Sequence, residues 1–148
     1  MRRLRYNRTT PAPFEILEHT ADIGFRARGR TRAELFANSA LALESIAVEI
    51  ETVQPRLPHP IAVTAEDDEA LLVNWLSEVL YHLDGRRVAL CRFQVDELES
   101  GAVRGRGWGE PWEEGRHVAK VIIKGVTYHQ LRIGKDAEGW SAQVFLDI

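Results

Sequence analysis

Few side chains in this sequence are spaced for catalysis. Five histidines are scattered along the chain: His19, His59, His82, His117 and His129. No His-Glu-x-x-His motif occurs, and the serines lack the Gly-x-Ser-x-Gly context of an activated nucleophile. The glycine-rich segment 101–109 is followed by no Gly-Lys-Ser/Thr, so it does not match a phosphate-binding loop. Hydrolytic catalysis is therefore not supported.

Two acidic residues stand beside apolar segments. Asp22 precedes Ile23, and Asp147 follows Leu146 and comes directly before Ile148, the last residue. A folded end would bring the Asp147 side chain close to the α-carboxylate of Ile148, and their repulsion would need a counter-charge. A divalent cation with Asp22 as a further ligand would supply it, and carboxylate oxygens suit calcium or magnesium better than zinc. The alternative is a frayed terminus with a solvated Asp147.

The composition indicates one domain. The 148 residues, 45% of them hydrophobic, are enough for one core and too few for two ordinary ones. The 22 acidic and 19 basic side chains give a net charge of -3, so the overall charge favours neither nucleic acid nor an anionic membrane. Cys91 is the one cysteine and lies in an apolar stretch, which indicates a buried structural thiol.

The N-terminal residues differ from the rest of the chain. We expect a flexible tail at 1–13 and a folded domain at 14–148. The arginines of the tail could also contact a phosphate backbone. The basic stretch is followed by prolines rather than by an apolar segment, and no apolar run approaches the ~18 residues of a membrane span. These features favour a cytoplasmic protein without a secretory signal.

Apolar periodicity predicts two helices. Thr31 and Glu34 form a capping box, and the apolar stripe that follows continues to about Val48. Asp67 or Asp68 caps a second helix with apolar residues at i, i+3, i+4 and i+7. Its stripe consists of Leu72, Trp75, Leu76, Val79, Leu80 and Leu83.

Alternation of apolar and polar residues predicts several strands. They are 14–18, 23–29, 61–65, 87–98, 102–108, 118–126, 128–133 and 140–146. Three prolines within 54–60 predict a loop there. We therefore expect an α+β domain, a two-layer sandwich in which a mixed, mostly antiparallel sheet is covered on one face by two helices.

Four separated segments resemble the archease family. They follow the order and spacing of that family from about Phe14 to Ile148. The segments are His19-Thr20-Ala21-Asp22-Ile23, the second predicted helix at 67–78, Lys124-Gly125-Val126-Thr127-Tyr128-His129, and Val144-Phe145-Leu146-Asp147-Ile148. Any one of these segments alone would be a weak match, and together they are specific.

The resemblance implies an activator and not an enzyme. Archeases promote guanylylation and multiple turnover of the RtcB-type RNA ligase, which uses GTP and a divalent metal to join RNA ends in tRNA splicing or RNA repair. The resemblance implies a bound divalent metal ion, with calcium preferred over magnesium or manganese. Its expected ligands here are Asp22, Asp147 and the terminal Ile148. The protein would contact GTP and RNA only indirectly, through the ligase. Neither sequence-specific binding of nucleic acid nor contact with a membrane is expected.

Three further residues belong to the matching segments. His19 is expected to orient Asp22 from behind the metal site. Lys124 could contact the ligase or GTP phosphates, or it could simply be solvated. His129 matches the family pattern, with Gln130 where glycine is common. Two other functions stay open: a stand-alone metal-dependent phosphotransferase or nuclease on the same carboxylates, and a chaperone-like binding module.

Overall fold

The computed structural model describes residues 12–18 and 22–148. The predicted tail at 1–13, apart from its last two residues, and His19 therefore lie outside the described part. The elements in chain order are β1 (Phe14–Glu18), β2 (Ile23–Gly29), α1 (Arg32–Ala47), η1 (Ile50–Thr52), β3 (Leu57–Thr64), α2 (Asp68–Asp84), β4 (Val88–Glu99), β5 (Ala102–Pro111), β6 (Gly125–Val126), β7 (Arg132–Asp136) and β8 (Gly139–Asp147).

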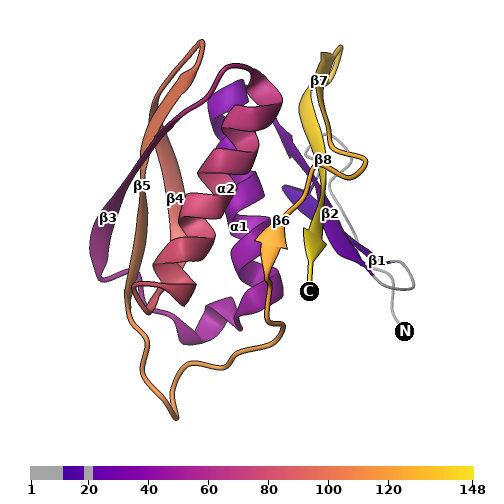
Figure 1. The fold of residues 1–148 in the computed structure, drawn as a ribbon. Coiled ribbons are helices and arrows are strands. Elements are labelled where there is room, and N and C mark those ends of the chain that lie inside the picture. Colours follow the sequence, from indigo (N-terminus) through magenta and orange to yellow (C-terminus); the bar gives the residue numbers. More distant parts are fainter. Residues whose placement is uncertain (1–11, 19–21) are drawn as a thin grey trace.

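The strands divide into two sheets that enclose the helices. Sheet I has the order β1-β2-β8-β6, with β7 also paired to β8, and sheet II has the order β3-β5-β4. Figure 1 shows α1 and α2 between them, with sheet II on the left and sheet I on the right. The α+β class is confirmed. Its arrangement is more elaborate than expected, since there are two antiparallel sheets instead of one mixed sheet and both helices lie between them.

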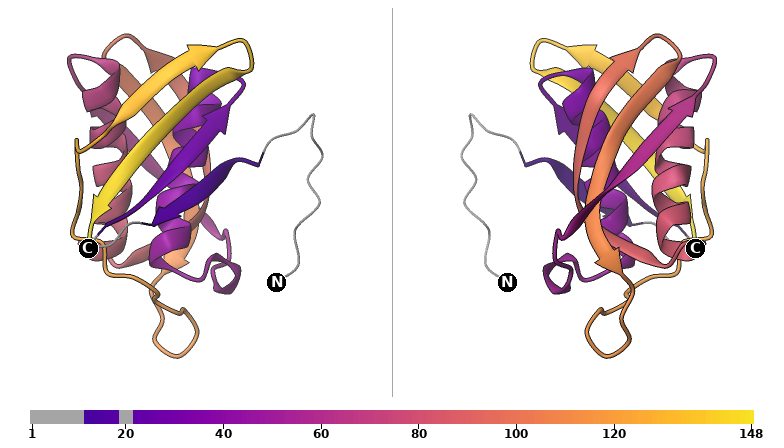
Figure 2. Two further views of the ribbon diagram at one scale, coloured as in Figure 1. Left: turned by 90° about the vertical axis from the view of Figure 1, so that its right-hand side faces the viewer. Right: turned by 90° about the vertical axis from the view of Figure 1, so that its left-hand side faces the viewer.

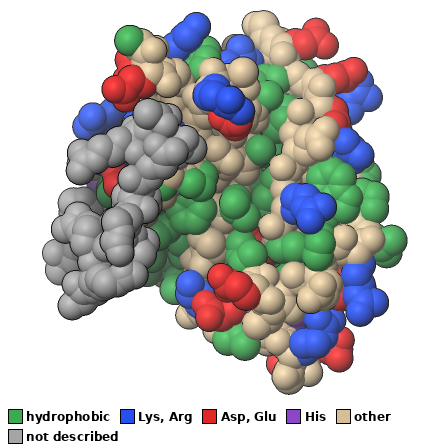
Figure 3. Space-filling model, turned by 180° about the vertical axis from the view of Figure 1, so that it is seen from behind, with side chains coloured by type: hydrophobic (Ala, Val, Ile, Leu, Met, Phe, Trp, Pro, Cys, Tyr) green, Lys and Arg blue, Asp and Glu red, His purple; other side chains and the backbone are tan. Residues whose placement is uncertain are grey.

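The core lies where the helices meet both sheets. Trp75 of α2 is fully buried, and its Nε1–H donates to the main-chain oxygen of Phe36 on α1 at 2.9 Å. Gly105 of β5 leaves room for this indole, because a Cβ there would lie 2.9 Å from its Cη2 atom. From behind, hydrophobic side chains gather over the middle of the face where α1 lies (Figure 3). Neither helix of the described chain is long and apolar enough to cross a membrane.

Both helices begin at the predicted caps. The Thr31 Oγ1 accepts from the Glu34 N–H at 3.1 Å, while the Glu34 carboxylate accepts from the N–H of Arg30 at 2.6 Å. Asp67 is the cap of α2, and its carboxylate accepts from the N–H of Ala70 at 2.8 Å. These bonds satisfy N–H groups that have no partner inside the helix.

The connection from β5 to β6 differs from the predicted strand at 118–126. Only the last two of those residues form a strand, β6, and the preceding residues make a single bridge, between Val48 and Ala119. The main chain of Val118 and Lys120 bonds to Glu49 and Ala47 around the end of α1, whereas Lys124, directly before β6, bonds to β8. Residues 112–124 therefore cross the lower end of the molecule from sheet II to sheet I (Figures 1 and 2).

The predicted loop at 54–60 is also partly wrong. β3 already begins at Leu57 and includes Pro58 and Pro60. β3 pairs only with β5 and lies at the edge of sheet II. Proline is tolerated in an edge strand because its missing N–H removes no bond of the sheet.

Candidate metal centre

Strands β2 and β8 bring two acidic residues to one end of sheet I. The strands pair antiparallel with Ile23 opposite Leu146, and the same register, continued one residue beyond this last pair, would place Asp22 opposite Asp147. Directly opposed residues of such a pair have Cβ atoms about 4.5–5.5 Å apart. The pairing thus brings together the strand ends next to these two carboxylates, although most of the sequence separates them.

Both carboxylates belong to the outer face of sheet I. Successive side chains of a strand point to opposite faces, and Ile23 and Leu146 pack into the core between the sheets. Asp22 and Asp147 take the opposite direction, and both are exposed. Like charges on neighbouring strands repel one another, so this corner favours a bound cation.

A third segment meets the same corner. Gly125 of β6 pairs with Asp147, and the Lys124 N–H donates to the Asp147 main-chain oxygen at 2.6 Å. The register places Lys124 beside Ile148, which is 43% exposed. Both views of Figure 2 show the C-terminus next to the segment that enters β6. The Lys124 ammonium group has no ion-pair partner among the described residues.

The donor set of this corner fits a hard cation. It consists of the side chains of Asp22 and Asp147 and the main-chain carboxylate of Ile148, all of them oxygen donors of the kind that calcium and magnesium prefer. Within residues 12–18 and 22–148, no three His, Cys, Asp or Glu side chains form a group that could hold a metal ion. A metal here would therefore need the terminal carboxylate as its third protein ligand, or a ligand from outside the described part.

The structure describes only one of the two histidines of the predicted site. His19 lies outside the described residues, so its expected role beside Asp22 stays a prediction. The His129 N–H donates to the Thr127 Oγ1 at 3.2 Å, and its ring centroid lies 6.1 Å from that of Phe145. His129 is thus held on the outer face of sheet I beside the strand that ends in Asp147.

A buried ionic cluster, which sequence patterns did not indicate, fixes the beginning of segment 112–124. Glu110 lies at the end of β5 and is 2% exposed. One of its oxygens accepts from Arg116 Nη1 at 2.7 Å and from the Gln54 N–H at 2.9 Å. Its other oxygen lies 2.9 Å from the Nε of Arg56. The Arg116 hydrogen bond is the main reason why the pKa of Glu110 is well below its ordinary value.

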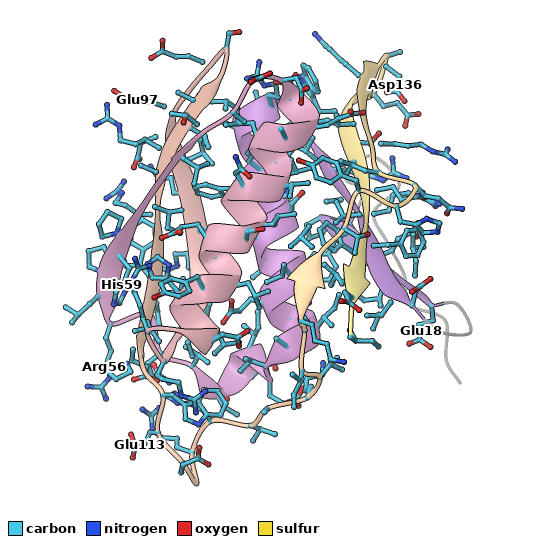
Figure 4. The ribbon with its side chains drawn as sticks, in the orientation of Figure 1. Glu18, Arg56, His59, Glu97, Glu113 and Asp136 are labelled. Atoms are coloured by element: carbon cyan, nitrogen blue, oxygen red, sulfur yellow. The ribbon has the colours of Figure 1, made fainter. Side chains whose placement is uncertain are left out.

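His117 completes this cluster with a defined proton position. Its Nδ1 accepts from the Glu113 N–H at 2.8 Å, so Nε2 carries the proton and donates to Glu110 at 2.8 Å. The His117 side chain is fully buried and packs on Trp112, with ring centroids 5.2 Å apart. Arg56 and Glu113 both lie at the lower end of the molecule in Figure 4. The cluster anchors the segment that later presents Lys124.

A second buried carboxylate lies in the core. Glu44 of α1 is fully buried, and one of its oxygens accepts from the Leu90 N–H at 3.1 Å while the other has no hydrogen-bond partner. Burial raises the pKa of Glu44 to about 8, and the nearby Asp84 acts in the same direction. Glu44 is therefore a neutral acid at neutral pH and is unsuited to bind a metal.

Comparison with known protein families identifies the family of this chain. The sequence model of the Archease protein family matches residues 14–148. The chain belongs to the archease family. It is 42% identical to the protein archease of Methanosarcina mazei over 139 residues, which cover 91% of this chain and 95% of that protein. The archease of Sulfurisphaera tokodaii is 31% identical, with 91% and 98% covered. The resemblance of the four sequence segments is confirmed.

Solved structures show the archease fold as well. The solution structure of Protein 1598 of Methanobacterium thermoautotrophicum matches with a TM-score of 0.76 at 31% identity, covering 92% of this chain and 99% of that one. The crystal structure of an archease from Thermotoga maritima, described as a possible chaperone, matches with a TM-score of 0.58 at 19% identity and full coverage of both chains. The second match concerns the fold alone.

Proposed function

We propose that this archease is a metal-binding activator of an RtcB-type RNA ligase, which promotes guanylylation and repeated turnover of the ligase. Membership of the archease family supports the proposal, and the relative from Thermotoga maritima is described as a possible chaperone, a role that also acts on another protein. The observation that supports it is the register of β2 and β8, which pairs Ile23 with Leu146 and so brings the strand ends next to the exposed Asp22 and Asp147 to one edge of sheet I.

The proposed ligands are Asp22, Asp147 and the carboxylate of Ile148, with His19 orienting Asp22. Calcium is the favoured ion because it accepts exposed carboxylate oxygens in flexible geometry, whereas magnesium demands near-ideal octahedral coordination. When bound, such an ion would neutralise negative charge on phosphoryl oxygens.

In this mechanism the residues of this chain bind the ion and position the partner. Asp22 and Asp147 would carry the charge of the site next to the ends of two paired strands, so the fold would hold them near one another before the partner arrives. Lys124 and His129 flank the site and are available to the ligase or to the phosphates of its nucleotide. The nucleophile and the RNA site belong to the ligase, because the chain offers no paired nucleophile and base.

Charge removal at the carboxylates tests the proposal. Asp22→Asn and Asp147→Asn should each weaken calcium binding, measured by titration calorimetry, and abolish stimulation of ligase turnover with GTP and RNA. Asp136→Asn is the matched control, since Asp136 is an exposed carboxylate at the opposite end of sheet I (Figure 4). Full stimulation by either site variant, or joined RNA in the absence of ligase, would contradict the proposal.

The terminal carboxylate needs its own test. Two extra residues after Ile148 would displace the α-carboxylate from Asp147 without altering any internal side chain. Calcium affinity and stimulation should both fall. Undiminished calcium binding by the extended chain would remove Ile148 from the ligand set and leave the two aspartates to be judged by their own variants.

A further inference from the structure

Several exposed apolar side chains lie close to the candidate metal centre in the sequence or in the register of β6 and β8. The large hydrophobic residues that the described chain leaves exposed are Ile16, Leu57, Tyr81, Val118, Ile122, Tyr128 and Ile148. The last four of these lie in the segment around β6 or at the end of β8. Ile122 is the most exposed, at 80%. Exposed large apolar side chains next to a functional site are a feature of protein interaction surfaces.

The fold holds Ile122 in this exposed position. Its neighbours Val121 and Ile123 pack against the core, and Ile123 is 2% exposed, so alternation directs Ile122 to solvent. The main chain on either side is tied down. The Lys120 N–H donates to the Ala47 oxygen at 2.8 Å, and the Lys124 N–H donates to Asp147 at 2.6 Å. Because the main chain around Ile122 is already held, little backbone conformational entropy is lost when a partner covers this residue.

Lys124 adds a charge that nothing in the described chain neutralises. Lys120, four residues earlier, lies 3.4 Å from a carboxylate oxygen of Glu49 and donates to the Ser45 main-chain oxygen at 3.0 Å. Lys124 has no such partner and lies beside Ile148 in the register of β6 and β8. A partner that covers this corner would therefore best present a carboxylate to Lys124 and an apolar recess to Ile122.

We infer that Ile122, Lys124, Tyr128 and Ile148 form the surface on which the RNA ligase docks. This inference rests on the proposed function, which requires the ligase to approach Asp147. A protein that reaches Asp147 must also cover Ile148, which follows it, and Lys124, whose main chain is bonded to it. The docking surface, named here by those four residues, is thus continuous with the candidate metal centre.

Substitution of Ile122 tests this surface without disturbing the core. In Ile122→Asp, the concentration of the protein that gives half-maximal stimulation of ligase turnover should rise about tenfold or more, as for a buried anchor of an interface. Maximal stimulation at saturation and calcium affinity should be unchanged, because the carboxylates are intact. Leu57→Asp is the matched control, since Leu57 is a 60% exposed apolar residue on sheet II.

The possible outcomes separate the surface from the proposed function. Stimulation by the wild-type chain together with an unchanged half-maximal concentration for Ile122→Asp would overturn the surface and leave the function standing. Loss of calcium binding in Ile122→Asp would overturn it too, because the substitution would then act through the metal site. A change confined to self-association, measured by sedimentation, would assign the patch to a second copy of the chain. A wild-type chain that neither binds nor stimulates the ligase would overturn both proposals.

Discussion

Glu44 and Glu110 are both removed from solvent, yet they differ in protonation. Glu44 is 0% exposed, accepts one hydrogen bond, from Leu90, and has its pKa raised by burial to about 8. Glu110 is 2% exposed and is surrounded by donors that include Arg116 and His117, which keep its pKa below the ordinary value. The same side chain is a neutral acid in the core and an anion at the end of β5.

The difference shows that the neighbours of a buried carboxyl group decide its charge. Burial alone disfavours the charged form, as at Glu44, and charged hydrogen-bond donors reverse that preference, as at Glu110. The two residues therefore have different structural roles. Glu44 belongs to the packing of α1 against sheet II, whereas Glu110 anchors the segment that presents Ile122 and Lys124.

Removal of the Glu110 charge should have the largest effect on stability. Glu110→Gln keeps the shape of the side chain but leaves Arg116 and Arg56 without their shared anion. The free energy of unfolding should fall by about 3 kcal/mol, the low end for a broken buried pair, because both arginines can turn towards solvent. Urea unfolding at pH 7 measures this loss.

Glu113→Gln is the control for this substitution. Glu113 pairs with the same Arg116, but its side chain is 61% exposed. Its loss should cost less than about 1 kcal/mol, as is usual for surface ion pairs. Equal losses for the two variants would show that the burial of Glu110 adds nothing to the pair.

The two carboxyl groups should give opposite pH dependences. Glu110, with a depressed pKa, contributes stability above its ordinary pKa that is lost as the pH falls towards the depressed value. Glu44 has a raised pKa, so its contribution is complete below about 4.5 and is lost as the pH rises to about 8.

Glu44→Gln isolates the second dependence. The unfolding free energy of this variant, relative to the wild type, should increase between pH 5 and pH 8 by at most about 1.4 kcal/mol per pH unit. Unfolding curves at several pH values measure the slope. A constant difference across this range would mean that Glu44 is already ionised at neutral pH.

His117→Phe should produce a smaller loss and tests how the cluster is coupled. Phenylalanine keeps the ring beside Trp112 but removes the donor to Glu110 and the acceptor for the Glu113 N–H. We expect a cost of about 1–2 kcal/mol. In a double-mutant cycle with Glu110→Gln, the combined loss should be less than the sum of the single losses. Simple additivity would show that His117 and Glu110 act independently.

The helices and the first two strands could be predicted because their signals are local. Thr31 and Asp67 cap the helices, and the stripe around Trp75 repeats with helical spacing. The same approach failed for the segment before β6, where the sequence pattern predicted a strand. Val121 and Ile123 are more buried than Lys120, Ile122 and Lys124 between and beside them, as in a strand, but the main chain just before them, at Lys120, bonds to Ala47 at the end of α1. Alternation reports which side chains are buried, not what the backbone bonds to.

The candidate site was predictable in its members but not in its geometry. The family resemblance marked Asp22 and Asp147, whereas no local pattern encodes the register of β2 and β8 that brings the adjoining Ile23 and Leu146 together. No sequence pattern marked Glu44 or Glu110 as a special residue. Glu44 meets Leu90 and Glu110 meets Gln54 across long stretches of sequence, so only the fold reveals which carboxyl group finds a cation.

The pairing of Ile23 with Leu146 also has a consequence for biosynthesis. β2 is translated early but stays an incomplete sheet with only β1 beside it until β8 has left the ribosome. Contacts between such distant segments form slowly, because a long loop must close before they are made. The strand ends that carry Asp22 and Asp147 can therefore come together only after β8 has been translated.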